Sequence, residues 1–136
     1  MRRKNESGVA AVEFALVVPI LMAIVIGIVE FGLAFNYRTQ LNNAAMAGAR
    51  HYAIHQNKAQ AVTAVTSAVT LPPGTPFGQS NIVVRNAGGT VVPSCPTVEG
   101  IVKNTVTVTV TAQRPTVTNM FGTSFNIAGK ATAVCM

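Results

Sequence analysis

The sequence lacks the residues that most enzymes use. Among its 136 residues there is no aspartate, and charged residues make up only 10%. A Ser-His-Asp triad therefore cannot form, and the sequence has no glycine-rich phosphate loop. His51 and His55 are four residues apart, but no Cys, Asp or Glu near them completes a metal site. We expect packing or solvated histidines, no metal, no cofactor and no enzymatic activity.

Acidic residues are also scarce, and the formal net charge is +6. The basic residues are scattered, and their only cluster is the leader Arg2, Arg3 and Lys4. A nucleic-acid surface would need a basic stripe with interleaved aromatics or a known motif, and neither is present. The positive-inside rule explains the leader better, because it holds Lys and Arg on the cytoplasmic side of a membrane helix. We predict contact with a membrane and none with nucleic acid.

Cysteine occurs twice, at Cys95 and Cys135, both beyond the apolar run described next. If the leader stays in the cytoplasm, both lie outside it, where a disulfide can form. Only one intrachain pairing is available, and a bridge closing a loop of about 40 residues would add about 3–5 kcal/mol. Two unrelated buried thiols are the alternative.

A long apolar run, residues 9–35, follows the leader and carries no charge between residues 14 and 29. About 20 apolar residues span a bilayer, so the run predicts a single transmembrane helix. It is too long for a secretory signal peptide, and no Ala-x-Ala cleavage site follows it. We expect this helix to remain in the protein, with a bend or local loosening at Pro19.

The helix is predicted to continue to about Ile54, because apolar and small residues keep a helical spacing there. These residues are Leu41, Ala44, Ala45, Gly48 and Tyr52. Asn57 is predicted to cap a second segment. In that segment Val62, Val65, Ala68 and Val69 form a stripe that fits a helix. Its Val and Thr content is also compatible with a strand, which is the alternative. We therefore divide the chain into a leader (1–8), a transmembrane or assembly helix (9–35), a helical extension (36–70) and a β head (71–136).

The β head is predicted from alternating apolar residues. A short strand at 82–85, a turn and a brief return through 90–92 precede a strict alternation of Val and Thr at 105–111, and residues 125–135 alternate again. A sheet with one apolar face needs a cover, and the outer half of the long helix is the obvious candidate. The expected fold class is α+β, a long N-terminal helix whose outer half packs on a small antiparallel sheet.

One carboxylate, Glu13, interrupts the start of the apolar run. Charges inside membrane helices are costly, and they are usually paired or functional. Cleavage between Gly8 and Val9 would create an α-amine four residues before Glu13, on the same helical face. The amine could then pair with the carboxylate of its own chain or of a neighbour. Glu30, farther along, is expected to be an interface carboxylate that reaches lipid headgroups or Arg38.

The basic leader, Gly8, the step of five residues to Glu13, Phe14 and the apolar helix together resemble a type IV prepilin processing site. Residues 7–19, with Glu30-Phe31-Gly32 and the Ala-rich stretch 42–50, resemble TadE-like proteins, the minor pilins or pseudopilins of the tight-adherence (Tad/Flp) pilus system. The resemblance implies a type IV pilin-like fold and cleavage after Gly8 by a membrane-embedded prepilin peptidase. It also implies that Glu13 and Phe14 act in recognition or assembly.

Two functions follow as expectations. The first is a structural minor pilin or pseudopilin in the inner (cytoplasmic) membrane, with its N-terminus cytoplasmic and its head extracytoplasmic. Its partners would be the peptidase, other pilin or pseudopilin subunits and the pilus assembly platform. The alternative is an uncleaved single-span membrane protein whose head binds a ligand or a partner.

Overall fold

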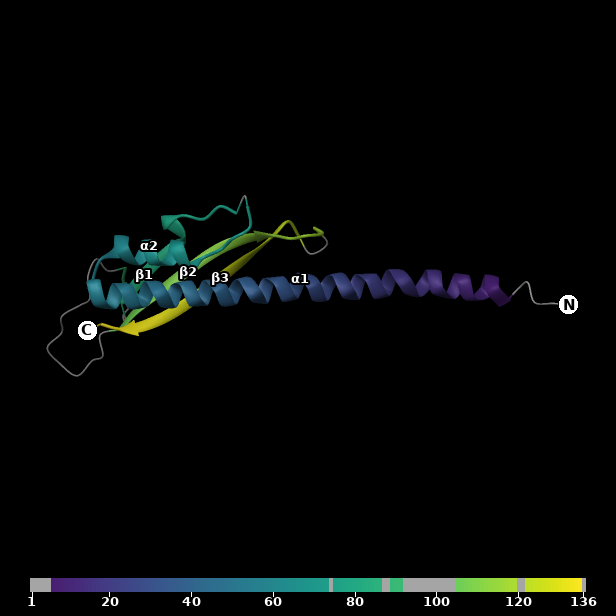
Figure 1. Ribbon diagram of the computed structural model, residues 1–136, viewed down its shortest axis with the longest axis horizontal. Coiled ribbons are helices and arrows are strands. Elements are labelled where there is room, and N and C mark those ends of the chain that lie inside the picture. Colours follow the sequence, from purple (N-terminus) through teal and green to yellow (C-terminus); the bar gives the residue numbers. More distant parts are fainter. Residues whose placement is uncertain (1–5, 74, 87–88, 92–104, 120–121, 136) are drawn as a thin grey trace. The chain divides into compact units, whose positions relative to one another are not determined.

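A computed structural model describes residues 6–73, 75–86, 89–91, 105–119 and 122–135. The chain divides into two units, Met1–Leu33 and Ala34–Met136. Its elements are α1 (Glu6–His55), α2 (Lys58–Ala68), the 3-10 turn η1 (Gln79–Asn81), β1 (Ile82–Asn86), β2 (Thr105–Pro115) and β3 (Ser124–Val134) (Figure 1). The predicted α+β class, with a long N-terminal helix and a small antiparallel sheet, is confirmed. We call residues 34–136 the head.

Helix α1 is continuous over 50 residues, a length of about 75 Å at 1.5 Å per residue. Pro19 lies inside the helix and does not end it. The prediction that one helix runs from the apolar segment to about Ile54 is therefore confirmed. Its last 22 residues, 34–55, belong to the head, so one helix serves both units.

A sharp corner joins α1 to α2. Gln56 takes a left-handed φ of 50°, and its N–H donates to the Tyr52 carbonyl at 2.9 Å. Asn57 then caps α2, because its Oδ1 accepts the N–H groups of Ala59 at 2.9 Å and Gln60 at 3.3 Å. The predicted cap is confirmed. The second segment, for which the sequence was compatible with either a helix or a strand, is a helix.

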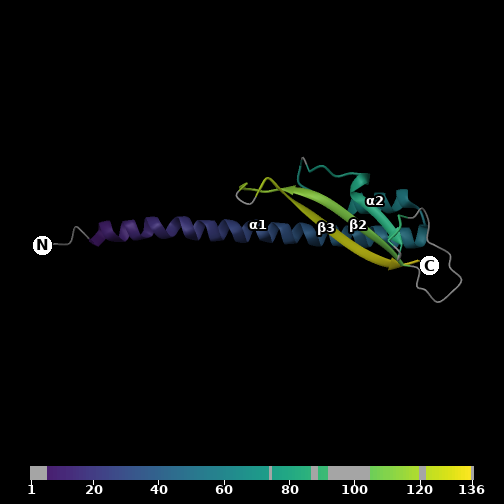
Figure 2. The same ribbon diagram turned by 180° about the vertical axis from the view of Figure 1, so that it is seen from behind.

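The sheet is three-stranded and antiparallel, in the order β1-β2-β3, so β2 lies in the middle (Figure 2). The register places Val84 opposite Val108 and Val108 opposite Ala131. Side chains alternate between the two faces of a strand, and the burial of β2 alternates accordingly. The predicted alternations at 105–111 and 125–135 are therefore correct.

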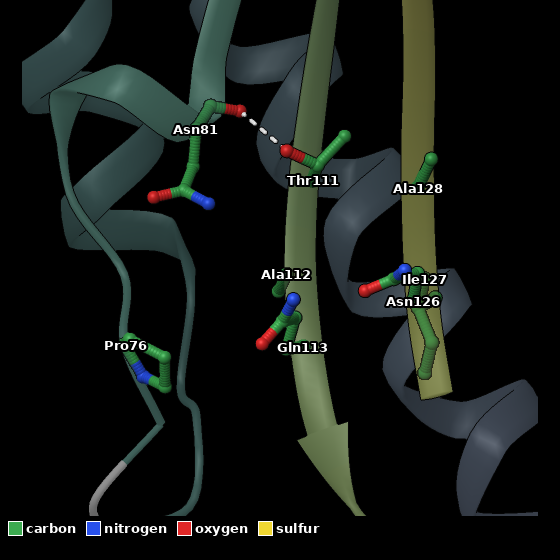
Figure 3. Close-up of a pocket in the computed structure, with 8 residues that line it drawn as sticks. All are labelled: Pro76, Asn81, Thr111, Ala112, Gln113, Asn126, Ile127 and Ala128. Carbon is green, nitrogen blue, oxygen red and sulfur yellow. Dashed lines mark hydrogen bonds between the residues drawn. The ribbon is translucent and has the colours of Figure 1, made fainter. Parts of the chain in front are cut away.

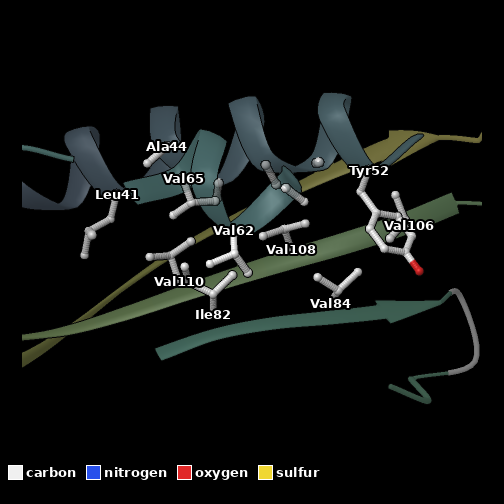
Figure 4. Close-up of a cluster of buried hydrophobic side chains, with 14 of the residues drawn as sticks. Leu41, Ala44, Tyr52, Val62, Val65, Ile82, Val84, Val106, Val108 and Val110 are labelled. Carbon is white, nitrogen blue, oxygen red and sulfur yellow. The ribbon is translucent and has the colours of Figure 1, made fainter. Parts of the chain in front are cut away.

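The core lies between the apolar face of this sheet and the two helices (Figure 4). The larger residues buried there are Leu41, Tyr52, Val62, Val65, Ile82, Val84, Val106, Val108, Val110 and Ile127. Burying one such side chain contributes about 1.5–3 kcal/mol. The predicted stripe of α2 is correct at Val62 and Val65 and wrong at Ala68, which is exposed because the helix ends there.

Two glycines allow the layers to approach closely. A Cβ on Gly129 of β3 would lie 2.2 Å from the carbonyl carbon of Leu41, a backbone atom that cannot move aside. A Cβ on Gly48 of α1 would meet the Val65 side chain of α2. Next to the first contact, the Lys130 N–H donates to the Asn42 side chain at 3.0 Å. These contacts position residues 41–48 of α1 on β3 and α2.

Two predicted features of the head need comment. The expected return strand at 90–92 is reduced to an isolated bridge between Arg85 and Val91, and residue 92 lies outside the described residues. Cys135 packs half-buried against the core. Cys95 lies outside the described residues, so the Cys95–Cys135 bridge remains a prediction.

Candidate assembly site on the N-terminal helix

The first half of α1 exposes large apolar side chains. Phe14 is 71% exposed and Ile28 is 68% exposed, and Val9, Leu21 and Leu33 are exposed as well. The most apolar 18-residue window of the helix has a mean hydropathy of 2.7, and none of it is buried within the chain. A helix that is apolar on all sides belongs in a protein core or a membrane. Because this one is not covered by the chain itself, it fits a single-pass membrane helix.

The Gly8–Val9 junction lies in the first turns of α1, which begins at Glu6. Gly8 is exposed, and a Cβ added to it would meet nothing within 4 Å. Val9 is 59% exposed. The peptide bond between them is therefore open to an approaching protein, and a larger side chain at residue 8 would not strain the fold.

Glu13 lies one helical turn beyond Val9, and its side chain is exposed. Residues four apart on a helix share one face, so Val9 and Glu13 lie one above the other. Phe14 is the adjacent residue and is also exposed. This geometry suits a charge pair between a Val9 amine and the Glu13 carboxylate, and it leaves the same carboxylate within reach of a neighbouring chain.

Residues 8–50 match the family described as TadE-like protein. The chain carries a TadE-like segment. The match begins at Gly8, includes Glu13 and Phe14, and ends before α2, so it contains no strand of the sheet. No curated protein and no solved structure matches the chain. The sheet and α2 lie outside the matched residues.

The TadE-like segment contains a second carboxylate, Glu30, which differs from Glu13 in its surroundings. Glu30 is only 2% exposed, whereas Glu13 is exposed. The expectation that Glu30 reaches lipid headgroups or Arg38 stays a prediction. The sequence places both carboxylates in the same apolar run, and only the structure distinguishes them.

A buried cation in the head was missed by the sequence analysis. Arg114 on β2 is 6% exposed, and its guanidinium carbon lies 5.1 Å from the centroid of the Tyr37 ring of α1. This distance is typical of a cation–π contact. The signal was available, because Arg114 continues the inward parity of Val106, Val108 and Val110.

The two histidines of α1 remain exposed, with ring centroids 5.5 Å apart. Within the part of the chain that the structure describes, no group of three His, Cys, Asp or Glu residues could hold a metal ion. The arrangement fits solvated side chains better than metal ligands.

Proposed function

We propose that this protein is a minor pilin or pseudopilin of a Tad pilus, made as a precursor with its basic leader in the cytoplasm. Cleavage after Gly8 releases Val9 as the new N-terminus, and the apolar half of α1 then packs against other helices of the assembly. The head lies outside the inner membrane. The observation that carries this proposal is the TadE-like segment, which begins at Gly8 and includes Glu13.

Three properties of the chain support the proposal. The Gly8–Val9 junction is exposed, so a peptidase has access to it. The apolar half of α1 has no cover of its own, which suits a helix that moves from lipid to a helical assembly. A Val9 amine would lie on the same helical face as Glu13, and pairing the two would lower the cost of keeping the carboxylate in an apolar environment.

Processing is tested by N-terminal sequencing and intact mass of the membrane form, in cells with and without the prepilin peptidase. We expect a chain that begins at Val9 in the first case and at Met1 in the second. Gly8→Val should block cleavage, because it enlarges the residue before the cut. Gly27→Val is the matched control, since Gly27 lies in the same helix with the same open surroundings. Retention of Met1 in assembled pili would contradict the proposal and favour the uncleaved single-span protein.

Assembly is tested separately with Glu13→Gln, which keeps the shape of the side chain and removes its charge. We expect normal cleavage and a large loss of the subunit from sheared pili or from the assembly complex. Glu13→Asp should retain part of the incorporation, because it keeps the charge. If Glu13→Gln assembles as well as the unchanged protein, pairing of the carboxylate has no role in assembly.

A further inference from the structure

The middle strand of the head is longer than the strand on one side of it. β3 pairs with β2 along its whole length, residues 105–115. β1 pairs only with residues 106–110, because it begins at Ile82, opposite Val110. Among the residues that the structure describes, residues 111–115 of β2 therefore have a neighbouring strand on one side only. An unpaired strand edge of this kind is a template for another strand.

The hydrogen bonds show which backbone groups face this gap. In an antiparallel sheet, successive residues direct their N–H and C=O groups to opposite edges. The Lys130 N–H donates to the Asn42 side chain and so points away from β2. Its partner Thr109 therefore points toward β1. By the same alternation, Gln113 directs its N–H and C=O into the gap beyond the start of β1.

A second bond on the opposite strand gives the same parity. The Asn86 N–H donates to the Thr90 carbonyl at 3.0 Å, away from β2. The neighbouring residue, Arg85, therefore faces β2 and exchanges hydrogen bonds with Thr107. Thr107 and Gln113 are both odd-numbered residues of one regular strand, so both direct their backbone groups to the β1 side.

A hollow of about 530 Å³ lies beside this unpaired edge, and we call it the edge slot (Figure 3). Pro76 and Asn81 border it on one side, and β2 and β3 form its floor. The side chains of Gln113 and Asn126 lie next to each other on the floor, since they are cross-strand partners. The slot is lined by Pro76, Asn81, Thr111, Ala112, Gln113, Asn126, Ile127 and Ala128.

The lining defines the chemistry that the edge slot accepts. None of its eight residues is ionisable, and three of them carry carboxamides, which both donate and accept hydrogen bonds. The Asn81 Oδ1 accepts the Gly78 N–H at 3.1 Å, so its NH2 group is the part available to a ligand. A charged ligand would lose hydration here without meeting an opposite charge. The slot therefore suits a neutral ligand rich in amide groups.

Two features limit the length of strand that the edge slot accepts. At one end the Thr111 hydroxyl donates to the Asn81 carbonyl at 3.3 Å, joining β2 to η1. At the other end Pro115 has no N–H, so strand pairing cannot extend past it. Residues 111–115 span about 16 Å at 3.3 Å per residue. The slot thus accommodates a short strand and excludes open-ended pairing.

We propose that the edge slot binds a short, uncharged, extended peptide segment of a partner protein, which adds a strand beside residues 111–115 of β2. Backbone hydrogen bonds to Gln113 hold the segment, and the carboxamides of Asn81 and Gln113, which border the gap, bond its remaining amide groups. This mode is β-strand addition. It concerns the head alone and does not depend on cleavage after Gly8.

The test uses the full chain in lipid nanodiscs and a blocked five-residue peptide of alternating threonine and valine. Before the peptide is added, the Gln113 amide should exchange with deuterium faster than the Thr109 amide, which is paired with Val83. At a peptide concentration of about ten times its Kd, exchange at Gln113 should slow about tenfold. Exchange at Thr109 should stay unchanged. The absence of protection at Gln113 at saturating peptide overturns the proposal.

Variants and altered peptides identify the contacts. Gln113→Pro removes the N–H that faces the slot and should weaken binding about fivefold, and N-methylation of the central peptide residue makes the same test without changing the protein. Asn81→Ala should weaken binding, whereas Asn126→Ala, on β3 and across β2 from the added strand, should not. If a peptide with a central lysine binds more strongly than the uncharged peptide, the claim that the slot prefers an uncharged ligand is wrong. If the protection of the Gln113 amide rises with protein concentration in the absence of peptide, the slot binds a second copy of this chain. That result would overturn the proposal that it binds a segment of a partner protein.

Discussion

The two halves of α1 differ in composition and in surroundings. In residues 9–33 apolar side chains occur on all sides and are exposed, as at Leu21, which is 56% exposed. In residues 34–55 apolar and small residues form one stripe that is buried against the head, and Leu41 is 0% exposed. The second half has enough polar residues to confine its apolar residues to one stripe, and that stripe finds its partner within the chain. The first half must find lipid or other helices.

The largest test of this contrast substitutes one leucine in each half. Leu41→Ala should destabilise the head by about 2–5 kcal/mol, because it removes a fully buried side chain and leaves a cavity. Leu21→Ala should leave the stability of the head unchanged, because Leu21 lies outside the head and is exposed. Thermal unfolding of the detergent-solubilised chain, followed by deuterium exchange of the β2 amides, measures both. Equal losses at the two positions would mean that the halves are not energetically separate.

The same comparison can be made with glycines. Gly129→Ala places a methyl group 2.2 Å from a backbone atom of α1, so the helix must move off β3. We expect a loss of about 3 kcal/mol, the upper part of the usual range for overpacking. Gly27→Ala meets nothing within 4 Å and should be neutral or slightly stabilising in the same unfolding measurement. A Gly129→Ala chain as stable as the unchanged protein would contradict the close contact of α1 with β3.

Much of this architecture could be predicted because it is periodic. The helical spacing of Leu41, Ala44 and Tyr52 predicted the buried stripe, and the alternation of Val106, Val108 and Val110 predicted the inner face of β2. The cap at Asn57 was recognisable because its mechanism is local. Each of these features depends on residues that are neighbours in the sequence. The same holds for Gly8 and Glu13, whose spacing is the signal.

Features that depend on distant segments could not be predicted. The sequence around Gly129 does not indicate that the backbone of Leu41 packs against this residue. The sequence around Glu30 likewise does not indicate that its side chain is buried. The unpaired edge at residues 111–115 follows from the length of β1 relative to β2, and sequence boundaries do not resolve that difference. Arg114 is the exception, because extending the β2 alternation by two steps places it inside.

A smaller effect concerns how the chain leaves the long helix. Asn57→Ala should destabilise the head by about 1 kcal/mol, because two N–H groups at the start of α2 lose their acceptor. Asn43→Ala is the control, since Asn43 is exposed in the interior of α1 and caps no helix end. We expect that variant to lie within a few tenths of 1 kcal/mol of the unchanged protein. Chemical denaturation measures both, and a loss of the same size at Asn43 would show that the effect is not capping.

The last expected effect is a pH dependence that arises in the buried half of α1. Burial raises the pKa of the Tyr52 hydroxyl, so the folded chain keeps this proton at a pH at which the unfolded chain has lost it. The stabilisation is complete below the unfolded pKa of about 10 and is lost as the pH rises through the folded pKa. Unfolding free energies from about pH 9 to about pH 11 should therefore fall with a slope of at most about 1.4 kcal/mol per pH unit from this group. Tyr52→Phe should remove that part of the slope. If the two slopes agree, Tyr52 ionises as easily in the folded chain as in the unfolded one, and the stripe is open to water at its end.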